Sequence, residues 1–293
     1  MSTEAGPPLT SQAFKEQAGE AWVRLQERTD AQIDPWGRAA IARLGVASGE
    51  QVLDVGCGCG QTLLELAELV GPTGRVLGVD ISGPMLARAR ERAAARPPIE
   101  LALGDAQTFA FSPGAFDAIY SRFGVMFFAD ARAAFANLWR AARPDGRLGF
   151  VCWQELARNP WAALPLAAVR RLLPPPAKPD PTPPVMMAEG QPGPFFLSDP
   201  ARVRAILGDA GWRDVEIAPV EMPLHFGGAA TLDEAVAYGL QIGPAARAIA
   251  EAPEDRRPPL EAAVRDALAP FASARGVWMD GAAFVVTARK SAN

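Results

Sequence analysis

The segment VLDVGCGCGQT, Val52–Thr62, changes abruptly from apolar, β-branched residues to glycine and cysteine. Its first half is typical of a buried strand, and the residues 62–69 that follow have the apolar spacing of a helix. A strand that ends at glycines and leads into a helix lets a ligand approach the backbone closely, and the free N–H groups of the helix attract an anion. The segment therefore predicts a ligand site at the carboxyl edge of a parallel sheet.

Strand-like and helical segments alternate around this stretch, from about Gln51 to Trp153, which predicts βαβ units in an α/β fold. We expect strands at 51–56, 75–81, 99–105, 116–123 and 147–153, and helices at 62–69, 84–95 and 131–142. Ser82 is the expected N-cap of the second helix, and the sequence RPDG is expected to end the third. Because most of these strands are apolar on both faces, helices should cover both sides of the sheet.

The pattern after Trp153 is less regular. Residues 172–194 contain so much proline that they indicate a linker or a lid, and an exposed insert without function is an equally good interpretation. Beyond them the sequence predicts a helix at 199–212 that starts at Asp199 as its N-cap. It also predicts a strand at 214–226, a helical section that begins at 231, and a hairpin or long strand at 277–290.

Composition narrows the class of partner. The chain has 293 residues, about half of them hydrophobic, and a net charge of -4 without a basic cluster, so we expect a small or neutral partner and no nucleic acid. No leader pattern and no uncharged run of roughly 18 residues is present, which favours a cytoplasmic protein without a membrane partner. The three cysteines, Cys57, Cys59 and Cys152, predict neither a disulfide framework nor a metal site.

The spacing of the glycines argues against a dinucleotide. Gly56, Gly58 and Gly60 form G-x-G-x-G, whereas the dinucleotide fingerprint requires a glycine where Gln61 stands. Asp54, directly before the loop, would repel a pyrophosphate because like charges repel at short range. A carboxylate at this position suits a ligand that carries an ammonium or a sulfonium.

Two further strand ends carry suitable side chains. Asp80 ends the second strand, where a carboxylate can accept hydrogen bonds from both hydroxyls of a ribose, although an ordinary helix-capping role remains an alternative. Ile81 would offer an apolar face to a purine. At the end of the third strand, Asp105 can hold an exocyclic amine while Ala106 packs on the ring. The three strand ends together predict a nucleoside site.

The set VLDVGCGCG, GVDIS, LGDA, FDAIYSRFGVMFF and LWRAARPDGRLGFVCW resembles the class I S-adenosylmethionine-dependent methyltransferases in order and spacing. The resemblance implies a doubly wound, Rossmann-like, mostly parallel sheet of seven strands in the order 3-2-1-4-5-7-6, with the last strand antiparallel. It implies S-adenosyl-L-methionine as cofactor, with its methionine part at the loop that contains Gly56, Gly58 and Gly60. Asp80 would then hold the ribose, Asp105 and Ala106 the adenine, and Ser121 would lie near the sulfonium and methionine end.

The resemblance also organises the remainder of the chain. Residues 1–46 look like the helical N-terminal cap of small-molecule members, and 47–154 form the cofactor-binding core. Residues 155–198 are assigned to a proline-rich lid or insertion, and 199–293 to the C-terminal part of the core, with a helical insertion at 229–274. Lid-sized segments favour an enzyme that acts on a small molecule.

The sequence does not single out a general base. Arg122 and Tyr120, near the end of the fourth strand, and His225, the only histidine, are the candidates. A salt bridge to an acid is at least as good an interpretation for Arg122, and a structural role is the better one for His225. Two sets of apolar residues could line an acceptor pocket or could belong to the core: Phe123, Met126, Phe127 and Phe128, and Trp22, Trp36, Trp153 and Trp161.

The favoured function is methyl transfer to an oxygen, nitrogen or carbon atom of a small-molecule acceptor, for example a natural product. A nicotinamide-dependent oxidoreductase shares the strand-loop-helix unit and Asp80, but Gln61 and Asp54 count against it. A non-catalytic protein that binds the same cofactor would retain every motif. The sequence leaves the acceptor atom and the choice between monomer and homodimer open.

Overall fold

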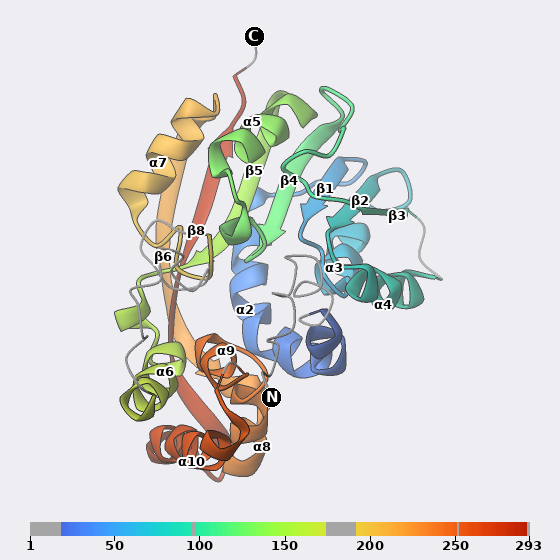
Figure 1. The fold of residues 1–293 in the computed structure, drawn as a ribbon. Coiled ribbons are helices and arrows are strands. Elements are labelled where there is room, and N and C mark those ends of the chain that lie inside the picture. Colours follow the sequence, from blue (N-terminus) through green and yellow to red (C-terminus); the bar gives the residue numbers. More distant parts are fainter. Residues whose placement is uncertain (1–18, 95–97, 174–191, 251, 292–293) are drawn as a thin grey trace, which may run out of the picture.

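A mostly parallel sheet forms the centre of the molecule (Figure 1). The structure is a computed structural model that describes residues 19–94, 98–173, 192–250 and 252–291. Its strands are β1 (Gln51–Val55), β2 (Arg75–Asp80), β3 (Ile99–Leu103), β4 (Phe116–Arg122), β5 (Ala142–Trp153), β6 (Arg213–His225), β7 (Ala272–Ser273) and β8 (Gly276–Arg289).

The strand order confirms the α/β fold class expected from the sequence. The main path runs β3-β2-β1-β4-β5-β8-β6, and the two-residue strand β7 pairs with β8 outside this path. Strands β1 to β5 pair in parallel, whereas β8 is antiparallel to both of its long neighbours, β5 and β6. With β8 counted as the seventh long strand, this is the expected order 3-2-1-4-5-7-6.

Helices cover both faces of the sheet. The described helices are α2 (Gln26–Leu44), α3 (Gln61–Val70), α4 (Gly83–Ala93), α5 (Ala131–Ala141), α6 (Pro160–Leu172), α7 (Pro200–Asp209), α8 (Leu232–Gly239), α9 (Pro244–Ala250) and α10 (Arg257–Leu268). Helix α2 packs on β4, β5, β8 and α3, while α5 and α7 pack against each other and on β5 and β6. The central strands β1, β4, β5 and β8 are mostly buried between these layers, as their two-sided apolar composition predicts, whereas the edge strands β3 and β6 are mostly half-buried or exposed.

A separate helical group lies where β6 and β8 extend past the other strands (Figure 1). Helix α6 packs on α9 and α10, and α10 packs on α8. The predicted helical insertion at 229–274 contains α8, α9 and α10, and residues 155–198 contain α6. The domain boundaries themselves stay a prediction, and most of the proline-rich stretch, 174–191, lies outside the described residues.

Side-chain caps define the starts of α4 and α7. Ser82 caps α4, since its side chain accepts a hydrogen bond from the backbone N–H of Met85, and Asp199 caps α7 in the same manner. Helix α5 ends at Ala141, just before RPDG, as expected, whereas β5 begins at Ala142 instead of Arg147 and so includes these four residues. The register between β4 and β5 shifts at this point, and Asp145 has a φ of 59°, so the residues form a bulge instead of a separate turn.

Candidate cofactor site

The ends of β1, β2 and β4 meet at the carboxyl edge of the sheet. The loop after β1 is tied to β2, because the N–H groups of Gly56 and Cys57 both donate to the carbonyl oxygen of Val79, at 2.8 and 3.3 Å. In the sheet register Asp54 pairs with Tyr120 of β4 on one side and with Gly78 of β2 on the other. The strand order reverses between β1 and β4, the position where open α/β sheets place their ligands.

The loop requires its glycines for conformation as well as for space. Gly56, Gly58 and Gly60 have φ values of 70°, 55° and 85°, in the left-handed region that residues with a Cβ rarely adopt. A Cβ on Gly56 would lie 3.0 Å from the Cα of Gly124, and one on Gly58 would lie 2.9 Å from the Cε of Met85. The loop therefore presents bare backbone at the strand edge, as a closely bound ligand requires.

Asp54 is a fully buried carboxyl group. One oxygen, Oδ2, accepts a hydrogen bond from the hydroxyl of Thr62, whereas Oδ1 is one of three buried side-chain polar atoms that lack a partner among the described residues. Burial raises the pKa of Asp54 to about 7, and the hydrogen bond from Thr62 and the charge of Arg122 act in the opposite direction. A buried carboxyl oxygen without a partner fits a cationic ligand group, such as an ammonium.

Asp80 lies at the end of β2 and is fixed by the backbone on two sides. Its Oδ2 accepts from the N–H of Gly58 at 2.8 Å, and its Oδ1 accepts from the N–H of Ser82 at 2.9 Å. Desolvation raises its pKa, and these backbone hydrogen bonds lower it. A carboxylate has about four acceptor positions, so a second acceptor position on each oxygen remains for two ligand hydroxyls.

The end of β3 supplies the third part of the edge. Ala106 is buried and Asp105 is exposed, while Ile81, after β2, keeps 44% of its surface exposed. The side chain of Asn137 on α5 donates to the carbonyl oxygens of Ala106 and Phe109, at 2.8 and 2.9 Å. Asn137 thus shapes this loop, a role that only the folded chain reveals because Asn137 is 31 residues away from Ala106.

Ser121, the predicted residue of β4, uses its hydroxyl in two hydrogen bonds to the backbone. It donates to the carbonyl oxygen of Val55 at 2.8 Å and accepts from the N–H of Gly124 at 3.2 Å. The side chain is buried, so it joins the ends of β1 and β4 beneath the loop. Its predicted place near the methionine end stays a prediction, and the hydroxyl acts through the backbone that it holds.

The geometry of two candidate bases argues against proton abstraction. The hydroxyl of Tyr120 donates to the carbonyl oxygen of Gly37, and burial raises its pKa, which keeps the phenol protonated. Arg122 forms an ion pair with Asp30 at 2.7 Å and donates to Gln61 at 2.6 Å. The salt-bridge interpretation of Arg122 therefore describes the structure.

His225 lies at the end of β6, in a structural setting. Its ring stacks on Trp278 with centroids 4.4 Å apart, and its Nε2 lies 3.0 Å from the carbonyl oxygen of Ala229. Both contacts hold the start of the loop before α8. The structural interpretation thus fits His225 better than the catalytic one.

Four aromatic side chains form a chain of ring contacts at the ends of β4 and β5. Phe123 stacks on Trp153 with centroids 4.2 Å apart, and Trp153 contacts Trp161 at 5.0 Å and Trp36 at 5.4 Å. Phe123 also has a φ of 59°, an unfavourable conformation for a large side chain, and strain of this kind is concentrated at functional sites. The aromatic cluster, defined as these four residues, adjoins the strand edge that carries Arg122.

The other aromatic candidates separate into different environments. Phe128 packs edge-on against Phe135 of α5, and Met126 is buried, so both belong to the core. Phe127 is 46% exposed, and Trp22 is half-buried before α2. The cluster therefore contains Phe123 from the first predicted set and three of the four tryptophans from the second.

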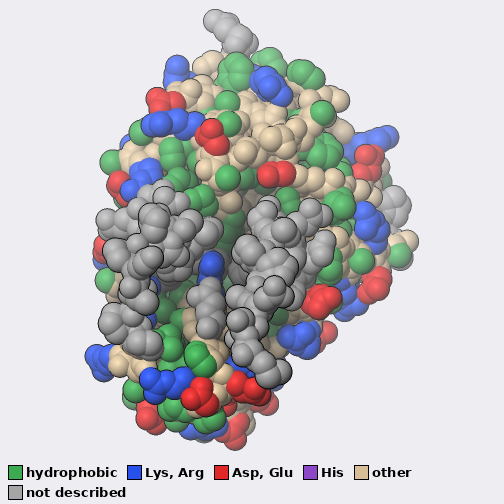
Figure 2. Space-filling model, viewed as in Figure 1, with side chains coloured by type: hydrophobic (Ala, Val, Ile, Leu, Met, Phe, Trp, Pro, Cys, Tyr) green, Lys and Arg blue, Asp and Glu red, His purple; other side chains and the backbone are tan. Residues whose placement is uncertain are grey.

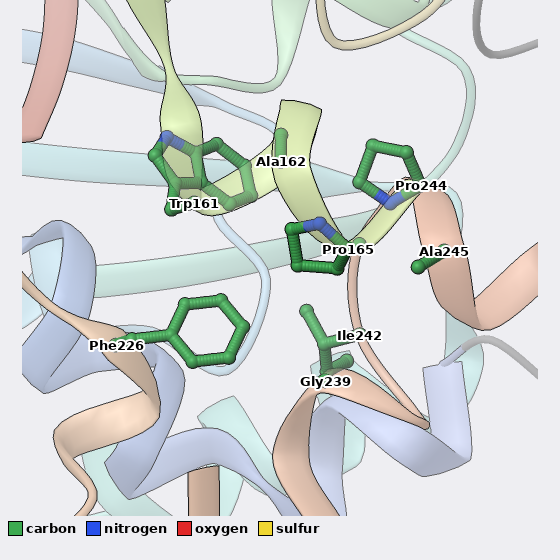
Figure 3. A pocket seen from close by; sticks show the side chains of 9 residues that line it. Trp161, Ala162, Pro165, Phe226, Gly239, Ile242, Pro244 and Ala245 are labelled. Carbon is green, nitrogen blue, oxygen red and sulfur yellow. The ribbon is translucent and has the colours of Figure 1, made fainter. Parts of the chain in front are cut away.

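A small pocket lies beside Trp161, within the helical group (Figure 3). Its lining is apolar and comes from α6, from the 3-10 turn Phe226–Gly228 and from the segment that joins α8 to α9, with Pro165, Phe226, Ile242 and Pro244 among its side chains. Its volume of about 10 Å³ admits hardly more than one water molecule. In this conformation it cannot hold an acceptor.

The three cysteines are in environments that disfavour both nucleophilic attack and metal binding. Cys57, Cys59 and Cys152 are free and buried, and burial raises the pKa of each thiol, to about 11 for Cys59. Thiols that stay protonated are poor nucleophiles and poor metal ligands. Within the described ranges, no group of three or more histidine, cysteine or acidic side chains is placed to hold a metal ion.

Residues 52–146 match a family described as "Methyltransferase domain". The chain thus contains a segment, from β1 to the start of β5, that is similar to methyltransferase domains. It is 38% identical over 117 residues to nocamycin O-methyltransferase of Saccharothrix syringae, an alignment that covers 39% of this chain and 42% of the relative. It is 34% identical over 119 residues to demethylmenaquinone methyltransferase of Lactococcus lactis, with coverages of 40% and 47%. The chain thus spans less than half the length of these two relatives.

Solved structures share the fold of the methyltransferase domain over most of the chain. Phosphoethanolamine N-methyltransferase 2 of Haemonchus contortus, solved with S-adenosylhomocysteine, superposes with a TM-score of 0.56 at 18% identity and covers 96% of this chain and 58% of its own. The [4+2]-cyclase SpnF superposes with a TM-score of 0.55 at 18% identity, with coverages of 99% and 100%. A cyclase with this fold shows that the fold alone does not determine the reaction.

Proposed function

We propose that the protein binds S-adenosyl-L-methionine at the carboxyl edge of the sheet and transfers its methyl group to a small-molecule acceptor. The observation that carries the proposal is the pairing of a glycine loop with a buried carboxyl oxygen, Asp54 Oδ1, that has no hydrogen-bond partner within the described part of the chain. The first feature makes room for a ligand against bare backbone, and the second favours a positive charge on it. The S-adenosylmethionine molecule carries both an ammonium and a sulfonium.

Different residues at the carboxyl edge of the sheet would bind different parts of the cofactor. Asp54 would hold the ammonium, and the loop from Gly56 to Gly60 would contact the methionine chain. The free acceptor positions of Asp80 would take the ribose hydroxyls. Ile81, with its exposed apolar surface, would pack on the adenine beside Asp105 and Ala106.

The cofactor, when bound, supplies a methyl group on a sulfonium that is already a good leaving group. The chain then has to hold the acceptor in line with that bond and to exclude water, and correct orientation alone can contribute roughly 7–11 kcal/mol to such a reaction. The aromatic cluster of Phe123, Trp153, Trp161 and Trp36 would form the apolar wall for the acceptor.

The state of the candidate bases restricts the acceptor chemistry. Tyr120 is a protonated donor, Arg122 is paired with Asp30, and His225 is engaged with Ala229 and Trp278. We therefore favour an acceptor whose attacking atom needs no strong base, such as an enolate or a free amine. The names of the two curated relatives, an O-methyltransferase and a demethylmenaquinone methyltransferase, support a small organic acceptor.

The remaining partner predictions belong to the same proposal. Among the described side chains of the face in Figure 2, acidic and basic residues are interspersed, which supports a small acceptor in preference to a nucleic acid. None of the described helices is long and apolar enough to cross a bilayer. The cytoplasmic location and the state of monomer or homodimer stay predictions.

Calorimetric titration with S-adenosylhomocysteine and, separately, with NAD tests the cofactor. We expect saturable binding of the first and none of the second, and the reverse result would restore the oxidoreductase alternative. Turnover tests the reaction: S-adenosylhomocysteine release is measured with S-adenosylmethionine and a panel of enolic, phenolic and amine acceptors. Binding without turnover across all acceptors would favour the non-catalytic alternative.

A further inference from the structure

Asp30, on the helix α2 that precedes the core, bridges two arginines. Its Oδ1 accepts from Arg122 Nη2 at 2.7 Å, and its Oδ2 accepts from Arg92 Nη1 at 3.3 Å. The side chains of Asp30, Arg122 and Arg92 are only 15%, 11% and 20% exposed. Removing one partner of an ion pair so well shielded from water strongly destabilises the folded protein, because the other charge is left buried without compensation.

Each of these arginines also holds the glycine loop. Arg92 Nη1 donates to the carbonyl oxygen of Cys59 at 2.9 Å, and Arg122 Nη1 donates to Gln61 Oε1 at 2.6 Å. Cys59 and Gln61 flank Gly60, the last glycine of the loop. One carboxylate therefore orients two guanidinium groups that grip the loop on both sides of the same glycine.

Helix α2 meets this part of the core along one face. Asp30, Asp34 and Gly37 follow one another at spacings of four and three residues, so they lie on the same side of the helix. Asp34 accepts from the side-chain amide of Gln61 at 2.6 Å. A Cβ on Gly37 would lie 2.7 Å from the Cδ of Arg122, so this glycine allows the close approach that Asp30 needs.

We propose that Asp30 is a positioning residue that couples the docking of α2 to cofactor binding at the glycine loop. The proposal rests on the proposed function, because it assigns a role within that same site. Without the carboxylate, Arg92 and Arg122 repel each other and release the loop from both sides. Coupling of this kind is reciprocal, so the cofactor stabilises the docked helix by as much as docking strengthens cofactor binding.

The Asp30→Asn variant tests the coupling, since it removes the charge and keeps the size of the side chain. We expect its dissociation constant for S-adenosylhomocysteine to rise about tenfold, within the usual range of coupling between sites. In the wild-type chain the same ligand should slow amide hydrogen exchange across Gln26–Leu44, and in the variant this protection should be lost. Asp30→Glu, which retains the charge, should recover most of the affinity.

Glu234→Gln is the matched control. It removes the ion pair between Arg28 and Glu234, which also anchors α2 but joins it to α8 instead of the loop. We expect its affinity to stay within about twofold of the wild type, because that pair is more exposed and contacts no loop residue. Its α2 amides should still be protected when the ligand binds.

The possible results separate this proposal from the one on which it rests. Wild-type affinity in Asp30→Asn, with undiminished protection of α2, would overturn the coupling and leave the proposed function intact. A wild-type chain that does not bind S-adenosylhomocysteine would overturn both. If Asp30→Asn does not fold, Arg92→Gln is the alternative, because it removes only one of the two hydrogen bonds that hold the loop, the one to Cys59. It should raise the dissociation constant for S-adenosylhomocysteine by about threefold to fivefold. An unchanged dissociation constant would also refute the coupling.

Discussion

The glycine loop, Gly56–Gly60, and the helical group of α6, α8, α9 and α10 are built in opposite ways. The loop is shaped by backbone dihedral angles and by hydrogen bonds between neighbouring strands. The helical group is held by side chains that pack across large sequence separations, such as α6 against α10. The loop can therefore be predicted from a short segment, whereas for the helical group the sequence predicts helices in 229–274 but not how they pack.

This difference assigns different tasks to the two regions. A cofactor shared by many enzymes needs the same contacts each time, and a fixed backbone loop with a few strand-end carboxylates, here Asp54 and Asp80, can supply them. An acceptor differs from enzyme to enzyme, and side-chain packing is easier to vary. Mutations in the loop should thus impair cofactor binding, and mutations in the helical group should alter stability or acceptor use while cofactor affinity is retained.

The largest expected effect comes from Gly56→Val. Strain at a φ of 70° and the 3.0 Å approach to Gly124 together should weaken S-adenosylhomocysteine binding by about 4 kcal/mol, which is roughly a thousandfold. Calorimetry on the folded variant measures this loss. Gly83→Val is the control, because a Cβ at Gly83 meets nothing within 4 Å. Tight binding by Gly56→Val would show that the loop is not the cofactor cradle.

The sequence predicted the loop region well for a local reason. The strand ends, the glycine spacing and the caps at Ser82 and Asp199 depend on residues within a few positions of one another. The RPDG sequence ends the helix as predicted, but the earlier start of β5 at Ala142 was not predicted, because the extra residues are accommodated only by pairing with β4. The hydrogen bond from Thr62 to Asp54 could have been anticipated, since Thr62 lies in the first turn of the helix that follows the loop.

The second prediction concerns Asn159, at the start of α6. Its side chain is buried and exchanges hydrogen bonds with the backbone of Ala282 in both directions, at 3.0 Å each, and accepts from the indole of Trp161 at 2.9 Å. Asn159→Ala should lower the free energy of unfolding by about 3 kcal/mol, because several buried groups lose their partner. Denaturant titration measures this, and cofactor affinity should be unchanged. A weakened affinity would break the division between the two regions.

Glu100→Gln is the reference for that measurement. Glu100 pairs with Arg75 in an ion pair whose side chains are 62% and 66% exposed. Its loss should change the free energy of unfolding by less than about 0.5 kcal/mol. A larger change would mean that the denaturation assay does not distinguish buried from surface contacts.

The sequence could not indicate Asn159, or Asp30, because their partners are far away in the chain. Asn159 and Ala282 are 123 residues apart, and Asp30 and Arg122 are 92 residues apart. An isolated polar residue has no periodicity that marks it as buried. For the same reason the sequence left the role of Arg122 open until its ion pair was located.

The third prediction is a smaller loss of cofactor affinity, caused by a substitution of Asp80 at the end of β2. Asp80→Ala should weaken S-adenosylhomocysteine binding by about 2 kcal/mol, because a charge-assisted pair of hydrogen bonds to the ribose is removed. Adenosine binding, measured by the same calorimetry, should fall by a similar factor, since it shares the ribose. Unchanged affinity for both ligands would refute the ribose assignment.

The smallest expected effect is a pH dependence that originates at Asp54. Its pKa in the free protein is raised by burial to about 7, so the carboxyl binds a proton in the folded state over a pH range in which the unfolded chain has released it. Between pH 4 and 7 this group therefore makes the free protein less stable as the pH rises. A cationic ligand group reverses the preference, because it favours the charged carboxylate.

Affinity for S-adenosylhomocysteine should consequently rise about tenfold between pH 6 and pH 8, as Asp54 changes from mostly protonated to mostly charged before binding. Proton release on binding at pH 6, detected by calorimetry in two buffers of different ionisation enthalpy, is an independent measure of the same event. In Asp54→Asn both signals should disappear and affinity should be low and flat over this range. A wild-type profile without a slope would mean that the ammonium lies elsewhere, and the unpartnered oxygen of Asp54 would then need a neutral donor from the ligand.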